Sequence, residues 1–237
     1  INTLYSIMRY FGSLIGRGSS MGDSVYFLIA VSVVLIFAFP LYWGLSTSLR
    51  APMDTFTVTG LGIPGIHFDP TLNNWLDQLV VPEMRKSIYN SIVISISSSF
   101  LALALGVPSA YALARFQFKL IQNRDITIWF LSQRVLPPVA TVIPFYLVLQ
   151  TFSLLDTHLA LILINTTFTL PFAVVIMRQA FLDLPIELEE ASMMDGASHF
   201  GAFWRIALPL SAPAVTATAL IIFAFTWSEL LFALVLS

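Results

Sequence analysis

The chain has 237 residues, of which 57% are hydrophobic and only 10% are charged. A soluble domain carries about a quarter charged residues, so this composition excludes an ordinary soluble protein and indicates one that crosses a membrane several times. The net charge of −2 says nothing about nucleic acid, and no basic cluster suggests that the chain binds it. The absence of cysteine excludes disulfide bonds and cysteine-ligated metals.

Long apolar segments recur along the chain and predict five membrane-spanning helices, so the expected fold class is an all-α polytopic helical bundle. Residues 1–23 form a flank before the first span, with either an interfacial helix at about 4–14 or no regular structure. The predicted spans cover about residues 24–48, 87–114, 126–150, 159–179 and 210–236.

The third predicted span contains Arg134 and the pair Pro137-Pro138. Proline lacks a backbone N–H, and such breaks often mark moving or cavity-lining helices. Arg134 lies about two turns from the near end of the span, and from there its side chain can extend to the interface. The alternative is that Arg134 serves a hinge or an internal salt bridge.

The distribution of positive charge predicts the orientation. Three basic residues fall in the loop between the first two spans: Arg50, Arg85 and Lys86. Seven fall on the other side if the N-terminus is cytoplasmic: Arg9, Arg17, Arg115, Lys119, Arg124, Arg178 and Arg205. We therefore expect a cytoplasmic N-terminus, which places the loop between the fourth and fifth spans in the cytoplasm as well.

That loop, residues 183–209, is a polar island with five carboxylates between two apolar segments. One charge at mid-bilayer costs roughly 2.5 kcal/mol or more, so the loop lies in water. Its pattern predicts two short helices, the first with Asp183 as N-cap and ended by Gly196 in the left-handed conformation. Ser198 caps the second helix, which continues to about Ala207, and Pro209 marks the next break.

Glu189 and Glu190 are adjacent in the first of these helices. Neighbouring helical residues point about 100° apart, so their carboxylates do not converge as an acid–base pair would. We interpret both as solvated helix charges. Leu188, Ala191, Ser192 and Asp195 share one face, where the small side chains allow another body to approach closely.

The same loop resembles the EAA motif of permease subunits of binding-protein-dependent ABC importers. Glu190-Ala191-Ser192, three residues, Gly196, nine residues and Ile206-Ala207-Leu208-Pro209 match the pattern, apart from Ser192 where alanine is usual. The resemblance implies the type I importer permease fold and a coupling helix that sits in a cleft of a cytoplasmic ATPase. The coupling residues it implies are Glu187, Glu190, Ala191, Ser192, Met194, Asp195 and Gly196.

Further segments resemble the carbohydrate branch of that family, and specifically its maltose-type second permease. They are IYNSIVIS, LGVPSAYALAR, RVLPPVATVIPFYLVL, LPFAVVIMRQAF and WSELLFALVLS. The resemblance implies a second homologous permease, two cytoplasmic ATP-binding subunits and an extracytoplasmic solute-binding protein as partners, all at the inner membrane of a bacterium or archaeon. It also implies a sixth span; because the chain begins at Ile1 and ends after five, we expect a longer gene product.

A sugar needs hydrogen-bonding side chains and aromatic faces in a wet cavity, and four residues of the last two spans are candidates: Asn165, Thr169, Trp227 and Glu229. Each has another interpretation. Asn165 and Thr169 suit close helix packing, and Trp227 suits an interface anchor. Glu229 either reaches water or lines a cavity.

The chain carries no GxxxxGK[ST] phosphate loop, no recognisable nucleophile motif and no metal-ligand spacing among its three histidines. We therefore expect neither a catalytic site nor a cofactor here, with ATP bound by the partner subunits. A permease for a non-sugar solute is one alternative. A self-contained channel or secondary transporter is another, and it requires ionisable sites near mid-membrane.

Overall fold

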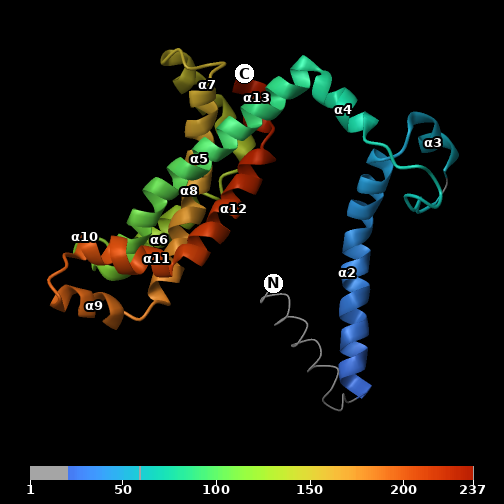
Figure 1. Cartoon of the computed structure of the whole chain (residues 1–237). Coiled ribbons are helices and arrows are strands. Elements are labelled where there is room, and N and C mark those ends of the chain that lie inside the picture. The colour runs from blue at the N-terminus through green and yellow to red at the C-terminus, as the bar shows by residue number, and fades with distance from the viewer. Residues whose placement is uncertain (1–20, 59, 237) are drawn as a thin grey trace. The chain divides into compact units, whose positions relative to one another are not determined.

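The computed structural model describes residues 21–58 and 60–236, and within these ranges the chain is helical with no β-strand (Figure 1). One isolated β-bridge, between Pro64 and Phe68, lies in a loop. The all-α fold class is confirmed. The interfacial helix considered for residues 4–14 lies outside the described residues.

The chain divides into two compact units, residues 1–85 and 86–237. In the first, α2 (Met21–Ser48) is a continuous helix that includes Pro40. Two short helices follow, α3 (Pro52–Thr57) and α4 (Asn73–Val80). Asn74 ties α4 to the end of α2, because its side-chain amide donates to the carbonyl oxygens of Ser48 and Arg50 at 3.1 and 2.7 Å.

Two long helices dominate the second unit, α5 (Pro82–Arg115) and α8 (His158–Leu182). The predicted second and fourth spans each lie inside one of them. The segment expected as a single third span is instead two helices, α6 (Asn123–Ser132) and α7 (Pro138–Thr151). Pro137 and Pro138 cause the break, since neither ring nitrogen can donate to the preceding turn.

The region expected as the second loop helix and the fifth span is also divided. It comprises α10 (His199–Ala202), a π-helical turn η1 (Phe203–Ala207), α11 (Leu208–Leu210), α12 (Ala212–Trp227) and α13 (Leu231–Leu236). The chain bends by 73° between Leu210 and Ala212. The break therefore lies at Ser211, two residues beyond the predicted Pro209.

Among the described residues, three helices are long and apolar enough to cross a membrane: α5, α8 and the Val25–Ser48 part of α2. The bent pair His199–Leu210 and Ala212–Trp227 makes a fourth if it is counted as one span. The protein is thus a helical membrane protein whose remaining apolar helices are short or broken.

α5 and α8 pack tightly against each other at Gly106. A Cβ atom built on Gly106 lies 2.5 Å from the Cβ of Ala173, which is fully buried in α8. Real Cβ atoms essentially never approach so closely, so only glycine allows this contact. Ala102, Ala173 and Ile222 form one buried cluster, and Val107, next to Gly106, belongs to another.

Gly106→Leu is expected to lower the free energy of unfolding by about 1–3 kcal/mol, because the added atoms force α5 away from Ala173. Thermal unfolding of the detergent-solubilised chain measures this. Gly44→Leu in α2 is the matched control, since nothing lies within 4 Å of its built Cβ. Equal melting temperatures for the two variants would contradict the close contact.

Candidate functional site

The acidic loop forms α9 (Glu187–Met194) and α10 at one end of the second unit, with α13 at the opposite end (Figure 1). Gly196 joins α9 to α10 with φ of +90°, the left-handed conformation expected for it. Ser198 caps α10 as predicted, its hydroxyl accepting from the Gly201 N–H at 3.1 Å. These local features follow directly from residue type.

The start of α9 differs from the prediction. Asp183 is the C-cap of α8, where its N–H donates to the Gln179 carbonyl and its carboxylate accepts from the Gln179 amide at 2.8 Å. α9 begins four residues later, with Ile186 as its N-cap and no side-chain cap. The reason is that α8 continues past its expected end at 179 and includes the residues before Asp183.

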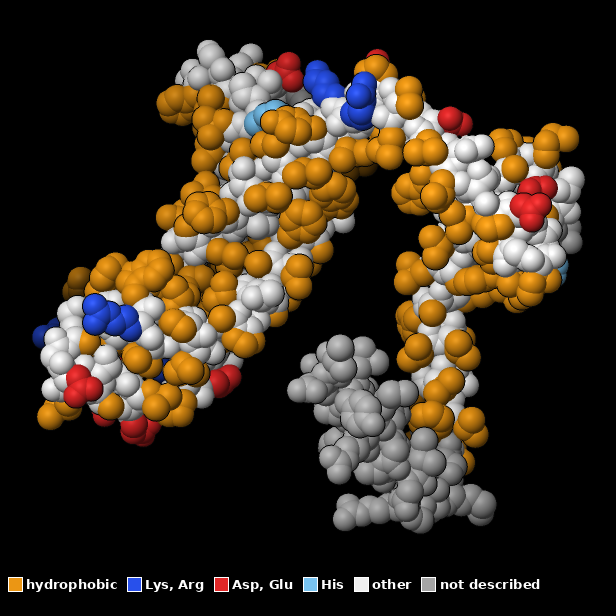
Figure 2. All heavy atoms as spheres, in the orientation of Figure 1, with side chains coloured by type: hydrophobic (Ala, Val, Ile, Leu, Met, Phe, Trp, Pro, Cys, Tyr) orange, Lys and Arg blue, Asp and Glu red, His pale blue; other side chains and the backbone are white. Residues whose placement is uncertain are grey.

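One face of α9 is exposed and carries most of the coupling residues that the resemblance implies. Ser192 is half-buried, and the other six are exposed: Glu187, Glu190, Ala191, Met194, Asp195 and Gly196. Met194 retains 88% of its accessible surface. Figure 2 shows acidic side chains at this end of the second unit. The exposed face is therefore acidic with small and apolar residues between the carboxylates.

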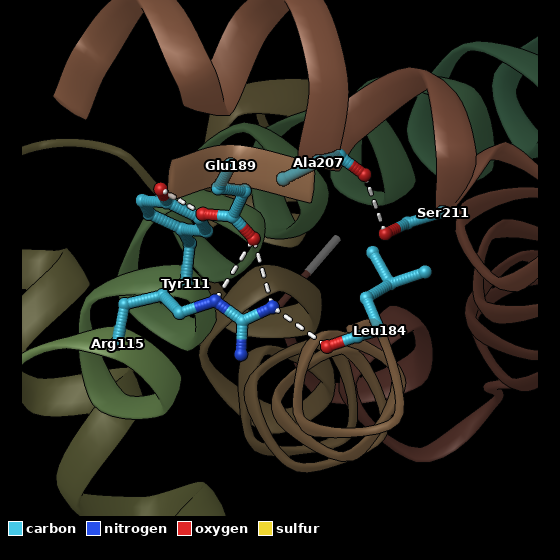
Figure 3. A network of polar contacts seen from close by, with 6 residues as sticks. All are labelled: Tyr111, Arg115, Leu184, Glu189, Ala207 and Ser211. Atoms are coloured by element: carbon cyan, nitrogen blue, oxygen red, sulfur yellow. Dashed lines mark hydrogen bonds and ion pairs between the residues drawn. The ribbon is translucent and has the colours of Figure 1, made fainter. Parts of the chain in front are cut away.

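Glu189 contradicts the sequence interpretation, because it is not a solvated charge. It is 3% exposed and is the one buried residue of α9. Its Oε1 forms an ion pair with Arg115 Nη2 at 2.8 Å and accepts from Arg115 Nε at 2.9 Å. Its Oε2 accepts from the Tyr111 hydroxyl at 2.6 Å. Figure 3 shows Tyr111 and Arg115 of α5 pointing toward this carboxylate.

Neighbouring groups complete the enclosure of the ion pair. Arg115 Nη2 also donates to the Leu184 carbonyl at 3.1 Å, in the link between α8 and α9. The Tyr111 ring contacts Phe181 edge-on at 5.4 Å and Phe203 at 4.8 Å between centroids. α5, α8, α9 and η1 therefore meet at one point, which we call the Glu189 cluster (Tyr111, Arg115, Phe181, Glu189 and Phe203).

Burial makes this cluster sensitive to the loss of either charge. The Arg115 and Glu189 side chains are 9% and 4% exposed. Removing one partner of a buried ion pair typically costs about 3–5 kcal/mol, because the other charge remains without compensation. The sequence held a partial signal for the site: Tyr111 and Arg115 are four residues apart and share one helix face. Nothing local identified Glu189 as their acceptor.

At the other end of the bundle, three of the four candidate substrate residues come together. Asn165, Trp227 and Glu229 line a cavity of about 60 Å³. Thr169 does not line it; its hydroxyl donates to the Asn165 carbonyl one turn away. Glu229 caps α13, since its carboxylate accepts from the Phe232 N–H at 2.9 Å. This cap starts a new helix and explains why the expected fifth span is interrupted after Trp227.

Two further hydroxyls, outside the four candidate substrate residues, line the same cavity. Ser95 and Thr226 are 1% and 5% exposed, and neither hydroxyl oxygen has a hydrogen-bond partner within the described part of the chain. A buried hydroxyl without a partner costs about 1–3 kcal/mol. The cavity shares lining residues, Ser91 and Leu161 among them, with a larger polar pocket of about 590 Å³.

Arg134 lies between α6 and α7 and contacts α8. Its Nη1 donates to the Phe168 carbonyl at 3.1 Å, and its guanidinium lies 4.0 Å from the ring centroid of Phe172. Among the residues that the structure describes, Arg115–Glu189 is the one ion pair, so Arg134 has no salt bridge within them. No group of three or more metal-ligating side chains occurs in these ranges.

Comparison with known proteins gives concordant matches. Residues 102–237 match the family described as binding-protein-dependent transport system inner membrane component. A probable ABC transporter permease of Sinorhizobium fredii is 34% identical over 86% of this chain and 72% of its own length. The trehalose/maltose transport system permease protein MalG of Thermococcus litoralis is 32% identical, over 86% of this chain and 72% of the relative.

Two more relatives extend this picture. The trehalose transport system permease protein SugB of Mycobacterium tuberculosis is 32% identical over 90% of this chain and 76% of its own length. Among solved structures, a bacterial ABC transporter involved in the import of the acidic polysaccharide alginate matches with a TM-score of 0.72 and 21% identity. That match covers 93% of this chain and 77% of the other, and it shows a common fold.

Gly196→Val is expected to open the turn between α9 and α10, because a left-handed residue with a side chain costs roughly 1–2 kcal/mol. The Ala197 N–H, which donates to the Ser192 carbonyl at 3.1 Å, should then exchange about 5–30 times faster. Amide hydrogen exchange measures this. Gly196→Asn is the control, since asparagine tolerates the conformation; equal exchange in both variants would contradict the explanation.

Proposed function

Because this chain belongs to the family of binding-protein-dependent transport system inner membrane components, we propose that it couples ATP hydrolysis on partner subunits to the import of a sugar or sugar-like solute. It is a membrane-spanning permease subunit. In the proposal, the exposed face of α9 docks into a cleft of a cytoplasmic ATPase. The observation that carries it is the acidic, solvent-exposed α9 at the end of an otherwise apolar bundle.

The chemistry of that face defines what the ATPase cleft must offer. Glu187, Glu190 and Asp195 are exposed, and Met194 and Ala191 lie among them. A complementary cleft therefore presents cations around an apolar floor. The excess of basic residues in the loops on the same side supports a cytoplasmic location of α9 and of the N-terminus.

The partners follow from the family and from the surfaces that this chain leaves open. Binding-protein dependence implies an extracytoplasmic solute-binding protein, and the proposal adds a second homologous permease and two ATP-binding subunits. α2 is apolar and long enough to cross the bilayer, where lipid or another membrane-spanning helix would cover it.

In the proposed mechanism, ATP binding closes the ATPase pair and carries the docked α9 with it. α9 packs on α10 and η1, and η1 leads through α11 into α12. A movement of the loop therefore reaches two helices of the bundle, α8 before it and α12 after it. Alternating exposure of the path to the two sides of the membrane would result from that movement.

The proposal of a sugar rests on two kinds of support. Relatives named for trehalose, maltose and diacetylchitobiose are 31–32% identical to this chain. In addition, the cavity beside Asn165, Trp227 and Glu229 holds two hydroxyls without partners. Its volume of about 60 Å³ exceeds the roughly 10–15 Å³ that one water molecule needs on this measure, so it has room for water or for a hydroxyl group of the solute. One end of the solute would enter it.

Glu190→Lys is expected to weaken association with the ATPase, because it reverses an exposed charge at the centre of the docking face. A loss of about tenfold in affinity corresponds to one interfacial charge contact. Co-purification of the ATPase with the permease pair measures it. Glu83→Lys, an exposed acid in the first turn of α5, is the control and should retain the ATPase; undiminished co-purification of the Glu190 variant would argue against docking.

Thr226→Val is expected to raise the KM for sugar uptake by about five- to tenfold, the worth of one hydrogen bond. Its melting temperature should stay equal or rise, since valine removes a buried hydroxyl without a partner. Uptake into vesicles and thermal unfolding measure the two effects. Thr216→Val, exposed on the same helix, is the control; an unchanged KM for the Thr226 variant would exclude this cavity from the path.

A further inference from the structure

The connection between the docking face and the membrane helices depends on few contacts. Glu189 is the one buried residue of α9. Within the described ranges it is also the one side chain of α9 with a hydrogen bond to another element, and both of its carboxylate oxygens are engaged by α5. Every other acidic side chain of α9 points into solvent.

We propose that Glu189 is a positioning residue that transmits the movement of α9 to α5 through Arg115 and Tyr111, and that it has no part in docking. This inference rests on the proposed function. Glu189 and Glu190 are adjacent and chemically identical, yet the first is buried and the second exposed. The structure therefore separates them: Glu189 faces the bundle, and Glu190 faces the solvent, where the proposed function places the ATPase.

The geometry suits transmission of force in more than one direction. Arg115 is the last residue of α5, and Tyr111 lies one turn earlier on the same face. Their contacts reach different oxygens of the carboxylate, Oε1 for Arg115 and Oε2 for Tyr111. A carboxylate held at both oxygens cannot rotate freely, so translation and rotation of α9 are both passed to the end of α5.

Arg115 also joins the point where the chain leaves α8. Its Nη2 donates to the Leu184 carbonyl as well as to Glu189. The covalent route from α9 passes back through this same link into α8. Without the ion pair, the link at residues 183–186 can bend when α9 moves, and the movement is absorbed there instead of reaching α5.

The test uses the complete transporter, with both permeases, the ATPase and the binding protein, in lipid vesicles. Glu189→Gln should retain the ATPase at the level of the unmodified complex, because the exposed face of α9 is unchanged. The number of ATP molecules hydrolysed per sugar imported should rise by about tenfold or more, as expected for the loss of a hydrogen bond to a charged group. Arg115→Gln should raise the ratio of ATP hydrolysed to sugar imported by the same factor. The variant that combines Glu189→Gln with Arg115→Gln should have a ratio no higher than either single variant, because each change removes the same link.

Tyr111→Phe tests the same link without removing either charge, so it leaves no unpaired buried charge that could impair folding. It removes the hydroxyl bond to Glu189 and keeps the ring contacts with Phe181 and Phe203, so an intermediate rise in the ratio is expected. Glu190→Gln reports on docking and should reduce ATPase association. Glu83→Gln, an exposed acid outside the loop, is the matched control and should leave both ATPase association and the ratio unchanged.

The outcomes separate the two proposals. If assembled Glu189→Gln and Tyr111→Phe complexes hydrolyse the same number of ATP molecules per sugar as the unmodified transporter, the transmission role is overturned. This holds even where Glu190→Gln loses the ATPase. Loss of the ATPase from Glu189→Gln to the same degree as from Glu190→Gln also overturns it, because Glu189 would then belong to the docking contact. Full ATPase retention by the Glu190 variants counts against the proposed function itself.

Discussion

A carboxylate removed from water is stable only where cations and hydrogen-bond donors replace the solvent, and Glu189 satisfies this condition through Arg115 and Tyr111. The requirement determines the arrangement around it. α5 must end where α9 passes, the link after α8 must present its carbonyl to Arg115, and aromatic rings from α8 and η1 must exclude water. The acidic loop is therefore part of the bundle on one face and open to solvent on the other.

The bundle itself is shaped by interruptions of its helices. Pro137 and Pro138 divide one apolar segment into α6 and α7, and the chain turns by 73° at Ser211. The π-helical turn η1 comes directly before that bend and places Phe203 against Tyr111. Such breaks leave backbone groups without helical partners, and membrane proteins tolerate them where other protein groups or water lie nearby. Here they lie beside the Glu189 cluster and beside Arg134, which donates to the Phe168 carbonyl.

Buried polar groups need hydrogen-bond partners at the cavity near α13 as well, but there some of them have none within the described residues. At the Glu189 cluster every charge has partners within the chain. At the cavity, the hydroxyls of Ser95 and Thr226 have none among the described residues, and Glu229 is held by the backbone at the start of α13. A satisfied cluster stiffens the structure, whereas hydroxyls without partners are available to a ligand or to water. The two ends of the second unit are thus suited to different tasks.

The amino-acid sequence by itself determined the features that depend on composition or on residues close together along the chain. Composition established a helical membrane protein, and residue type placed the left-handed turn at Gly196 and the cap at Ser198. The spacing from Glu190 to Pro209 identified the family, later confirmed by the match over residues 102–237. Tertiary structure alone decided that Glu189 is buried while Glu190 is exposed, since the partner Tyr111 lies 78 residues away. It also decided which polar residues share a cavity, because burial is a property of neighbours that only folding brings together.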